Sequence, residues 1–413
     1  MNKIYFDHSA STPVLPQVTR AMTDYLTENY GNPSSLYETG QAAKSVVESA
    51  RATVAGILGA DDSREIVFTA GGTEADNLAI KGVAEAKAEK GRHIVASAIE
   101  HPAVLETLNY LEKHGFDVTY VPVDKNGIVN SDAVADAITD KTVLVSVMMV
   151  NNVVGTVQPI KEISRHTRRR GVIFHTDAVQ AVGNLHIDVN NLGVDLLAVS
   201  GHKFHGPKGI GALYVRKGTR LNPIIHGGGQ EKGKRSGTEN VPGIVGFTKA
   251  LEIVTSEREE KNARLSELRE RLVGDVLSSV EDTIYLGDPE KRLSGNACFS
   301  FKYIEGESLV LHLDMMGIAV SSGSACASRS LEPSHVILAM GRSPVAAHGS
   351  LRITLGRGTK ESEVDEFVRV LPDVVAKLRK MSPFSAEAPA EMFGAPRAGP
   401  GNDHHSDSYE KSV

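Results

Sequence analysis

Between Arg64 and Arg216 the chain alternates short runs of β-branched and apolar residues with longer amphipathic stretches that begin after turn residues. This alternation predicts βαβ units, in which mostly parallel strands form one sheet and helices cover its faces. The expected strands are residues 65–70, 93–99, 117–123, 142–150, 172–178, 195–200 and 210–215, and the clearest helices are 74–91 and 103–115. Ligands of an open α/β sheet bind beyond the carboxyl ends of its strands, so we expect the chemistry of this chain there.

The rest of the chain predicts a second, smaller α/β unit. Residues 242–280 have a helical pattern, and the charged stretch inside them is typical of the solvated face of a long helix between two domains. After Met381 the composition shifts to Pro, Ala, Gly and Ser, which indicates a disordered or loosely docked tail. We predict four parts: an N-terminal segment at 1–14 that packs with the small domain, a large domain at 15–260, a small C-terminal domain at 261–381 and a flexible tail at 382–413.

The composition argues against two classes of partner. A net charge of −6 over 413 residues gives no basic field that would hold a nucleic acid backbone. No apolar run approaches the roughly 20 residues of a membrane-spanning helix, and the first residues lack the pattern of a secretory signal. The two cysteines, Cys298 and Cys326, are too few for a disulfide framework. We therefore expect a cytoplasmic protein with free thiols.

The turn after the first expected strand can bind an anion. Gly71, Gly72 and Thr73 can present backbone N–H groups and a hydroxyl to a phosphate. A plain connection between a strand and a helix would have the same sequence. These residues by themselves leave both interpretations open.

Asp177 and Lys203 follow two other expected strands. The Asp177 carboxylate can pair with a protonated ring nitrogen, or it can cap the turn that follows it. Lys203 can form an imine, or it can be an ordinary solvated charge. A phosphate cradle, a carboxylate for a ring nitrogen and an imine-forming lysine are the three groups that pyridoxal phosphate requires of a protein. Their combination at one predicted sheet edge therefore indicates this cofactor.

Histidines and a glycine-rich segment complete the polar candidates. His101 can stack on a cofactor and move protons, or it can have a structural role. His175, His202 and His205 lack the spacing of zinc ligands, so we expect no metal site. Residues 227–238 are Gly-rich and basic, and they form either a flexible surface loop or an arm that completes an anion site in a neighbouring subunit.

Cys326 lies in SSGSACASRS, a run of small residues that a packed core does not need. A thiol in such a loop can be a mobile nucleophile, or it can be a small side chain on a turn. Cys298 in the apolar run ACFSF suits a buried and inert side chain instead. Cys326 is therefore the candidate reactive thiol.

A set of ordered segments resembles the cysteine desulfurases of the NifS and IscS type over nearly the whole chain. The segments are FTAGGTEADNLAIKG, AIEHPAV, VNNVVGTVQP, HTDAVQAVG, SGHKFHGPKGIGALYV, GGGQEKGKRSGTEN and SSGSACAS followed by LEPSHVILAMG. The resemblance implies a fold-type-I pyridoxal phosphate transferase, with a mostly parallel seven-stranded sheet in the large domain and a smaller α/β C-terminal domain. It also implies a homodimer that takes sulfur from L-cysteine, leaves L-alanine and a persulfide on Cys326, and supplies an iron–sulfur scaffold protein and other thio-cofactors.

The resemblance further assigns catalytic roles. It makes Lys203 the Schiff-base lysine, Asp177 the partner of the ring nitrogen and Cys326 the persulfide-forming cysteine. His101 would stack on the ring and carry protons. No resident metal is implied, although Cys326 can ligate an iron–sulfur cluster transiently.

Binding roles follow from the same resemblance. Asn152 and Arg352 would hold the substrate carboxylate, a task that suits the bidentate fork of arginine. Gln180 would hydrogen-bond the phenolic oxygen of the cofactor. The implied cofactor ligands are Gly72, Thr73, His101, Asn152, Asp177, Gln180, Ser200, His202, Lys203 and, from the other subunit, Thr238.

Three positions depart from the usual pattern of the family. His8 stands where an amide is common, Val153 where an acidic residue is usual, and Arg329 where the cysteine loop often has glycine. The charge of Arg329 could lower the pKa of the Cys326 thiol or alter the loop.

Other functions stay open from the sequence. A selenocysteine lyase or an aminotransferase would use the same cofactor, and a sulfur-relay or scaffold-binding subunit would need little turnover. Lys208 is the alternative imine-forming lysine. The tail could dock on a scaffold protein or be inert, and its His404 and His405 form at most a weak metal site.

Overall fold

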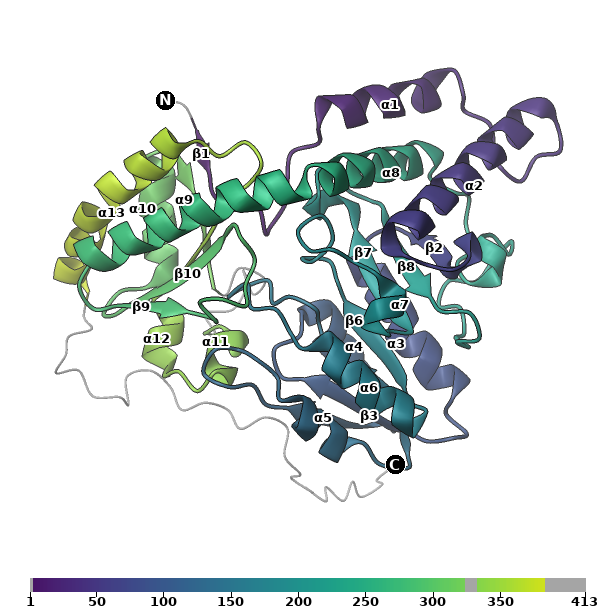
Figure 1. Cartoon of the computed structure of the whole chain (residues 1–413), viewed down its shortest axis with the longest axis horizontal. Helices are drawn as coiled ribbons and strands as arrows, with labels where there is room; N and C mark the ends of the chain where they lie inside the picture. Colours follow the sequence, from purple (N-terminus) through teal and green to yellow (C-terminus); the bar gives the residue numbers. More distant parts are fainter. Residues whose placement is uncertain (1–2, 324–332, 383–413) are drawn as a thin grey trace, which may run out of the picture.

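The computed structural model describes residues 3–323 and 333–382, which form a larger and a smaller sheet with helices around them (Figure 1). Within these residues the larger sheet has seven strands in the order β2-β8-β7-β6-β5-β3-β4. They are β2 (Ile66–Thr69), β3 (His93–Ser97), β4 (Asp117–Val121), β5 (Thr142–Ser146), β6 (Ile173–Asp177), β7 (Leu196–Ser200) and β8 (Gly211–Val215). Strand β8 runs antiparallel to both of its neighbours, and the other pairs are parallel. The mostly parallel seven-stranded sheet expected from the sequence is thus confirmed.

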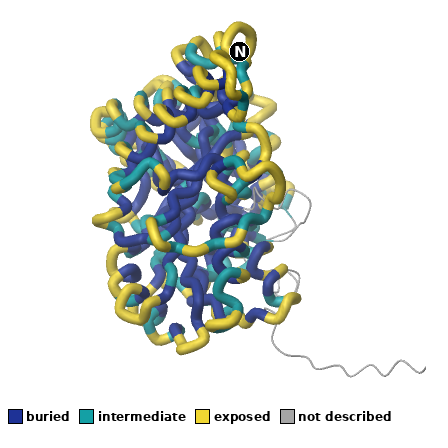
Figure 2. The backbone as a smooth tube through the Cα atoms, turned by 90° about the vertical axis from the view of Figure 1, so that its right-hand side faces the viewer, coloured by how far each residue is buried: buried dark blue, intermediate teal, exposed yellow. Residues whose placement is uncertain are grey.

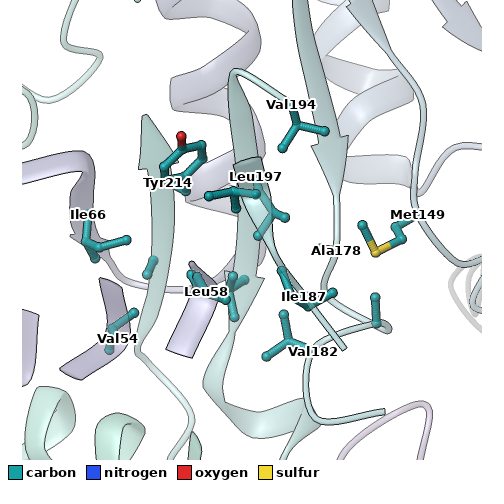
Figure 3. Packing of buried hydrophobic residues seen from close by; sticks show 14 of the residues in the cluster. Val54, Leu58, Ile66, Met149, Ala178, Val182, Ile187, Val194, Leu197 and Tyr214 are labelled. Atoms are coloured by element: carbon teal, nitrogen blue, oxygen red, sulfur yellow. The ribbon is translucent and has the colours of Figure 1, made fainter. Parts of the chain in front are cut away.

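Alternate residues of this sheet face two different apolar layers. In β2, Ile66 and Phe68 belong to one buried cluster and Val67 belongs to another, as the two-residue period of a strand requires. Helices α2 (Glu38–Leu58), α6 (Ile160–Arg170) and α8 (Val241–Ser256) cover the first face, and α3 (Gly72–Ala86) and α4 (Pro102–Glu112) cover the second. Figure 3 shows part of the first layer, with Leu58, Ile66 and Tyr214 among its side chains.

The smaller sheet is antiparallel, with strand order β12-β13-β10-β9. Its strands are β9 (Thr283–Leu286), β10 (Asn296–Phe301), β12 (Ser321–Ser322) and β13 (Ser350–Thr354), and its helices are α9 (Arg258–Ser279), α10 (Gly306–Met315) and α13 (Glu361–Met381). Phe299, Phe301 and Phe367 lie in a buried cluster that is distinct from the two clusters of the larger sheet. Cys298 in β10 is fully buried, and burial raises the pKa of its thiol to about 12, so it is inert as expected.

Two helices join the layers where the sequence predicts one long helix. Helices α8 and α9 run end to end from the larger to the smaller sheet (Figure 1). Glu257 separates them, with φ −93° and ψ −1°. In α9 the buried side chains Leu265, Leu268, Leu272 and Val276 recur every three or four residues, which leaves the charged face in solvent.

The N-terminal segment connects the two sheets. Strand β1 (Ile4–Tyr5) pairs in parallel with β11 (Ile318–Ala319), and Asp7 then bridges to Thr354 of β13. Five residues later, the Thr12 amide donates to the carbonyl oxygen of His202 at 2.9 Å, next to β7. We call residues 7–12 the N-terminal strap, because they pass from the smaller sheet to the larger one.

The remaining elements are short or lie at the periphery. They are α1 (Pro16–Thr27), α5 (Ser131–Ala137), α7 (Val189–Leu192), α11 (His335–Ala339), α12 (Pro344–His348) and the 3-10 turns η1 (Ser63–Glu65), η2 (Gly201–Lys203) and η3 (Glu231–Gly233). Figure 2 shows the buried backbone running through the middle of the molecule, with exposed turns at its rim. Within the described ranges, no helix has the length and apolar character to cross a membrane. The domain boundaries after residues 14, 260 and 381 stay predictions.

Candidate active site

A cavity of about 280 Å³ opens at the carboxyl ends of β6 and β7, where the N-terminal strap meets the start of α3. It is lined by Ser9, Ala10, Gly72, Thr73, Asp76, His101, Met148, Asn152, Asp177, Val179, Gln180, Ser200, His202, Lys203 and Arg352. All of the residues to which the resemblance assigns a role line it, except Cys326 and Thr238. Cys326 lies outside the described residues, as do Arg329 and residues 383–413, and Thr238 is exposed in the 227–238 segment.

Lys203 lies in η2, directly after β7. Its Nζ donates hydrogen bonds to the carbonyl oxygens of Ser9 at 2.5 Å and Ala10 at 2.9 Å. Lys208, the alternative lysine, lines a neighbouring cavity instead. Only Lys203 of the two therefore places its amine at the wall shared with Asp177.

The start of α3 forms one end of the cavity. Gly71 caps this helix without a side-chain hydrogen bond, and the first N–H groups of a helix have no partner within it. A Cβ atom on Gly72 would lie 2.7 Å from Val179 Cγ2 and 3.3 Å from Ser200 Cβ, so the close packing requires glycine there. The turn is thus a strand-to-helix connection that also presents backbone donors to the cavity.

Asp177 ends β6 and is only 5% exposed. Its Oδ1 accepts a hydrogen bond from the Val179 amide at 2.8 Å. Burial raises the pKa of Asp177 to about 6, although this hydrogen bond and the nearby charge of Lys203 act in the opposite direction. The carboxyl therefore caps a turn and also lines the cavity, and its pairing with a ring nitrogen stays a prediction.

His101 is the N-cap of α4 and is neutral at physiological pH. Burial, together with the charges of Lys203 and His335, lowers the pKa of His101 to about 4. Its Nδ1 accepts a hydrogen bond from the Ala103 amide at 3.1 Å. The ring proton of neutral His101 is therefore assigned to Nε2.

Arg352 in β13 brings a cation from the smaller sheet to the cavity. Its guanidinium donates to Asp7 Oδ1 at 2.7 Å and to the Asn152 carbonyl oxygen at 2.9 Å. Arg352 Nε is buried and has no hydrogen-bond partner among the described residues. Since arginine has five N–H donors, this side chain can bind a further carboxylate.

The strap is the part of the site that the sequence did not predict. Ser9 offers its carbonyl oxygen to Lys203 and also to Gln180 Nε2 at 2.9 Å. Ser11 Oγ lies 3.3 Å from His202 Nδ1. Backbone carbonyl groups occur in every residue type, so no sequence signal could have located these contacts.

Two of the positions that depart from the family pattern lie in apolar or neutral surroundings. His8 packs edge-on against Tyr5 with 5.0 Å between ring centroids, and burial followed by the charge of His205 lowers the pKa of His8 to about 4. Val153 is buried in an apolar cluster with Met148. An acidic side chain at position 153 would be buried in this apolar cluster, which is unfavourable for a carboxylate. Valine is apolar and can be buried there without this cost.

The Gly-rich segment 227–238 is anchored at its centre. Glu231 is buried, and its two carboxylate oxygens accept hydrogen bonds from Arg51 at 2.6 Å and 2.7 Å. The Phe68 amide donates to the same carboxylate at 2.9 Å. The segment is therefore not a loose surface loop at this point.

Comparisons with known proteins agree over most of the chain. The family described as aminotransferase class-V matches residues 4–367. The cysteine desulfurase IscS of Methanosarcina thermophila is 53% identical over 382 residues, which cover 92% of this chain and 94% of the relative. The cysteine desulfurase IscS of Dictyoglomus turgidum is 48% identical over 385 residues, with 93% and 98% covered.

Solved structures are similar to this chain over most of its length as well. A structure titled NifS-like protein has a TM-score of 0.86 and 39% identity, and the match covers 91% of this chain and 100% of that chain. A structure of SspA in complex with cysteine has a TM-score of 0.77 and 39% identity, with 86% and 99% covered. The likeness to these solved structures therefore extends over most of the chain.

Proposed function

Because this chain belongs to the class-V aminotransferase family and, within it, to the cysteine desulfurases, we propose that it removes sulfur from L-cysteine in the cavity described above and releases L-alanine. The observation that carries this proposal is that Lys203, Asp177, the start of α3 and Arg352 line one cavity. These groups come from separate parts of the sequence, and they are the groups that the reaction needs.

We propose pyridoxal phosphate as the resident cofactor, since its three reactive parts fit three parts of the cavity. The first turn of α3, with Thr73, Ser200 and His202 beside it, suits the phosphate. The Asp177 carboxyl suits the ring nitrogen, and the Lys203 amine suits the aldehyde. When bound, the cofactor supplies a sink for the electron pair that is released at the substrate α-carbon.

Lys203 would be the base of the reaction. The Ser9 and Ala10 carbonyl oxygens hold its amine on the strap side of the cavity. From this position the amine accepts the proton of the substrate α-carbon. A fixed base of this kind contributes about 10²- to 10⁴-fold to a rate.

Arg352 and Asn152 would orient the substrate by its carboxylate. Arg352 is already fixed by Asp7 and the Asn152 carbonyl, and it keeps N–H donors for a further carboxylate. Holding the carboxylate there would keep the α-carbon in the cavity that Lys203 also lines.

His101 would donate a proton during sulfur release. The neutral ring accepts a hydrogen bond at Nδ1 from the backbone, so its proton lies on Nε2, and this N–H would be the proton donor. His101 and Lys203 line the same cavity, which supports this role for His101.

Cys326 would receive the sulfur. The C–S bond of L-cysteine breaks, the sulfur forms a bond with the Cys326 thiolate, and the electron pair of the broken bond stays on carbon, which takes a proton. L-Cysteine and one protein thiol thus give L-alanine and one protein persulfide, with no outside oxidant or reductant. An iron–sulfur scaffold protein is the acceptor that we propose for the persulfide sulfur.

We further propose that the protein acts as a cytoplasmic homodimer. Leu26 near the end of α1, and Tyr30, Leu36 and Tyr37 between α1 and α2, are 64%, 78%, 93% and 64% exposed. Exposed apolar side chains that lie together mark an interaction surface. In the dimer, Thr238 would contact the phosphate of the partner's cofactor.

The test is a product assay with the purified protein, pyridoxal phosphate, L-cysteine and a thiol reductant. Sulfide and alanine should form in equal amounts. Lys203→Ala should lose turnover by about 10²-fold or more, whereas the matched variant Lys208→Ala should keep most of it. Cys326→Ala should keep the cofactor absorption and lose sulfide release.

Two results would contradict the proposal. Alanine formation that is independent of Cys326 would exclude the persulfide step. An unchanged cofactor spectrum in Lys203→Ala would show that another lysine holds the cofactor.

A further inference from the structure

The cavity contains a second carboxyl group, Asp76, that the mechanism above does not use. Asp76 lies in α3, is 1% exposed and lines the same cavity as Asp177. Its Oδ1 has no hydrogen-bond partner among the described residues. Since a buried carboxylate without a hydrogen-bond donor is unfavourable, this environment disfavours the ionised form of Asp76.

His175 lies next to Asp76 and is buried as well. Its Nε2 is 3.4 Å from Asp76 Oδ1, and its Nδ1 is 2.9 Å from Ser146 Oγ on the neighbouring strand β5. Nε2 has no hydrogen-bond partner among the described residues. His175 and Asp177 are two residues apart on β6, so both side chains point to the same face of the sheet.

We propose that Asp76 is held as a neutral carboxylic acid whose O–H faces His175, so that Asp177 is the single carboxylate that the cavity offers to the cofactor ring. The role of Asp177 toward the cofactor ring rests on the proposed function, but the charge of Asp76 is a property of the protein without the cofactor. Asp76 acts through Asp177, and it is therefore a positioning residue.

The surroundings decide which carboxyl keeps the proton. Asp177 accepts the Val179 amide and lies near the cation of Lys203, and both favour its ionised form. Asp76 receives no such donor, and burial, followed by the negative charges of Asp177 and Glu100, raises the pKa of Asp76 well above its usual range. The start of α3 favours an anion, but this effect fades beyond the first turn of a helix.

The remaining titratable groups around Asp76 fit the same assignment. Burial lowers the pKa of His175 to about 3, so this ring is neutral and can accept the Asp76 proton at Nε2. Its own proton then lies on Nδ1 and is donated to Ser146 Oγ. Burial raises the pKa of Glu100 to about 8, so Glu100 is mostly protonated at neutral pH, and burial and the charge of Asp177 are the main causes of the raised pKa of Asp76 there.

A neutral Asp76 has a consequence for Asp177. Two carboxylates in one buried site raise each other's pKa, so an ionised Asp76 would return a proton to Asp177. Asp177 would then stop acting as the counter-ion of a protonated ring nitrogen. With Asp76 neutral, Asp177 stays ionised in the physiological range.

Infrared difference spectroscopy of the full-length protein tests the charge of Asp76 directly. The wild-type spectrum minus that of Asp76→Asn should contain the carbonyl band of a protonated carboxylic acid, which shifts in heavy water. Glu100→Gln is the matched control, because it removes the other buried acid and should leave the Asp76 band in place. Carboxylate bands in the first difference spectrum, instead of the acid band, would overturn the proposal.

The pH dependence of cofactor absorption gives a second readout. An amide and a neutral acid carry the same charge. Asp76→Asn should therefore shift the pH midpoint of the change in cofactor absorption by less than about 0.3 pH units relative to the wild type. A downward shift of about one unit or more would overturn the proposal, because it would show that Asp76 carries a negative charge. If no variant shows a cofactor band, the proposed cofactor is wrong, and the infrared result still decides the charge of Asp76.

Discussion

At the scale of single residues, burial sets the charge of the side chains around the cavity. Glu100 is fully buried. Its Oε1 accepts two hydrogen bonds, one from the Ser97 hydroxyl and one from the Met148 amide at 2.8 Å. Its Oε2 has no hydrogen-bond partner in the described part of the chain. Burial raises the pKa of Glu100 from 4.5 to about 8, and the charge of Asp177 acts in the same direction.

This pKa predicts that the protein loses stability as the pH rises. The folded state binds the Glu100 proton more tightly than the unfolded state. The contribution of this proton to the free energy of unfolding is therefore complete below pH 4.5 and is lost as the pH rises past about 8. The loss is on the order of 5 kcal/mol at most. Glu100→Gln keeps the acceptor oxygen without the proton, so its free energy of unfolding should fall less over this range. Urea unfolding at several pH values measures it.

The matched control is Glu259→Gln, which changes an exposed side chain of α9. Its stability should follow the wild-type pH profile. Parallel profiles for wild type and Glu100→Gln would show that Glu100 does not keep a proton in the folded state.

Arg352 provides a prediction on substrate binding. Arg352→Lys keeps a cation for Asp7 but removes the planar fork, so the proposed carboxylate contact is weakened. We expect KM for L-cysteine to rise roughly 10- to 100-fold with a smaller change in kcat, since charged hydrogen bonds contribute about 1.5–3 kcal/mol. Steady-state kinetics checks this.

Arg357→Lys is the control, because Arg357 pairs with Glu257 at 2.6 Å and does not line the cavity. It should leave KM near the wild-type value. A larger effect on kcat than on KM in Arg352→Lys would point away from a role in binding the substrate carboxylate.

At the scale of elements, the sequence predicts the strands of the larger sheet well and the anchoring of the 227–238 segment poorly. The strands are short apolar runs between turn residues, and burial on both faces of a parallel sheet produces such runs. Arg51 and Glu231 are 180 residues apart, and charged side chains are usually solvated. Nothing in the sequence shows that these two residues meet in the interior.

The buried pair predicts that Glu231 stabilises the protein through this segment. Glu231→Ala leaves the Arg51 guanidinium buried without its carboxylate, so the free energy of unfolding should fall by about 3–5 kcal/mol. Lys234→Ala, three residues along, should change it by less than about 0.5 kcal/mol. Urea unfolding measures both. Equal stabilities for the two variants would mean that the segment is not held by this pair.

At the scale of the whole molecule, the site is assembled by contacts between distant parts of the chain. The sequence locates Asp177 and Lys203, because both follow strands of one sheet and ligands bind at that edge. It does not locate Asp7, which reaches Arg352 across 345 positions. It also does not show that Asp76, in the helix α3 that follows the turn after β2, is enclosed with His175, since enclosure depends on how α3 packs on the sheet.

The proposed dimer is the last prediction, and it links the surface to the cavity. Tyr30→Glu combined with Leu36→Glu places two charges in the exposed apolar stretch between α1 and α2. Desolvating these charges opposes association, so the variant should sediment or scatter light as single 44.2 kDa chains where the wild type forms pairs. If Thr238 of one copy completes the phosphate site of the other, the separated chains should also bind pyridoxal phosphate about 10-fold or more weakly.

Leu277→Glu, at a 44% exposed position in α9, is the control for an added surface charge. It should keep both the paired state and the cofactor affinity. A wild-type protein that is monomeric at micromolar concentration would contradict the dimer. A dissociated variant with unchanged cofactor affinity would keep the dimer but remove Thr238 from the phosphate site, because the cavity of one chain would then bind the cofactor alone.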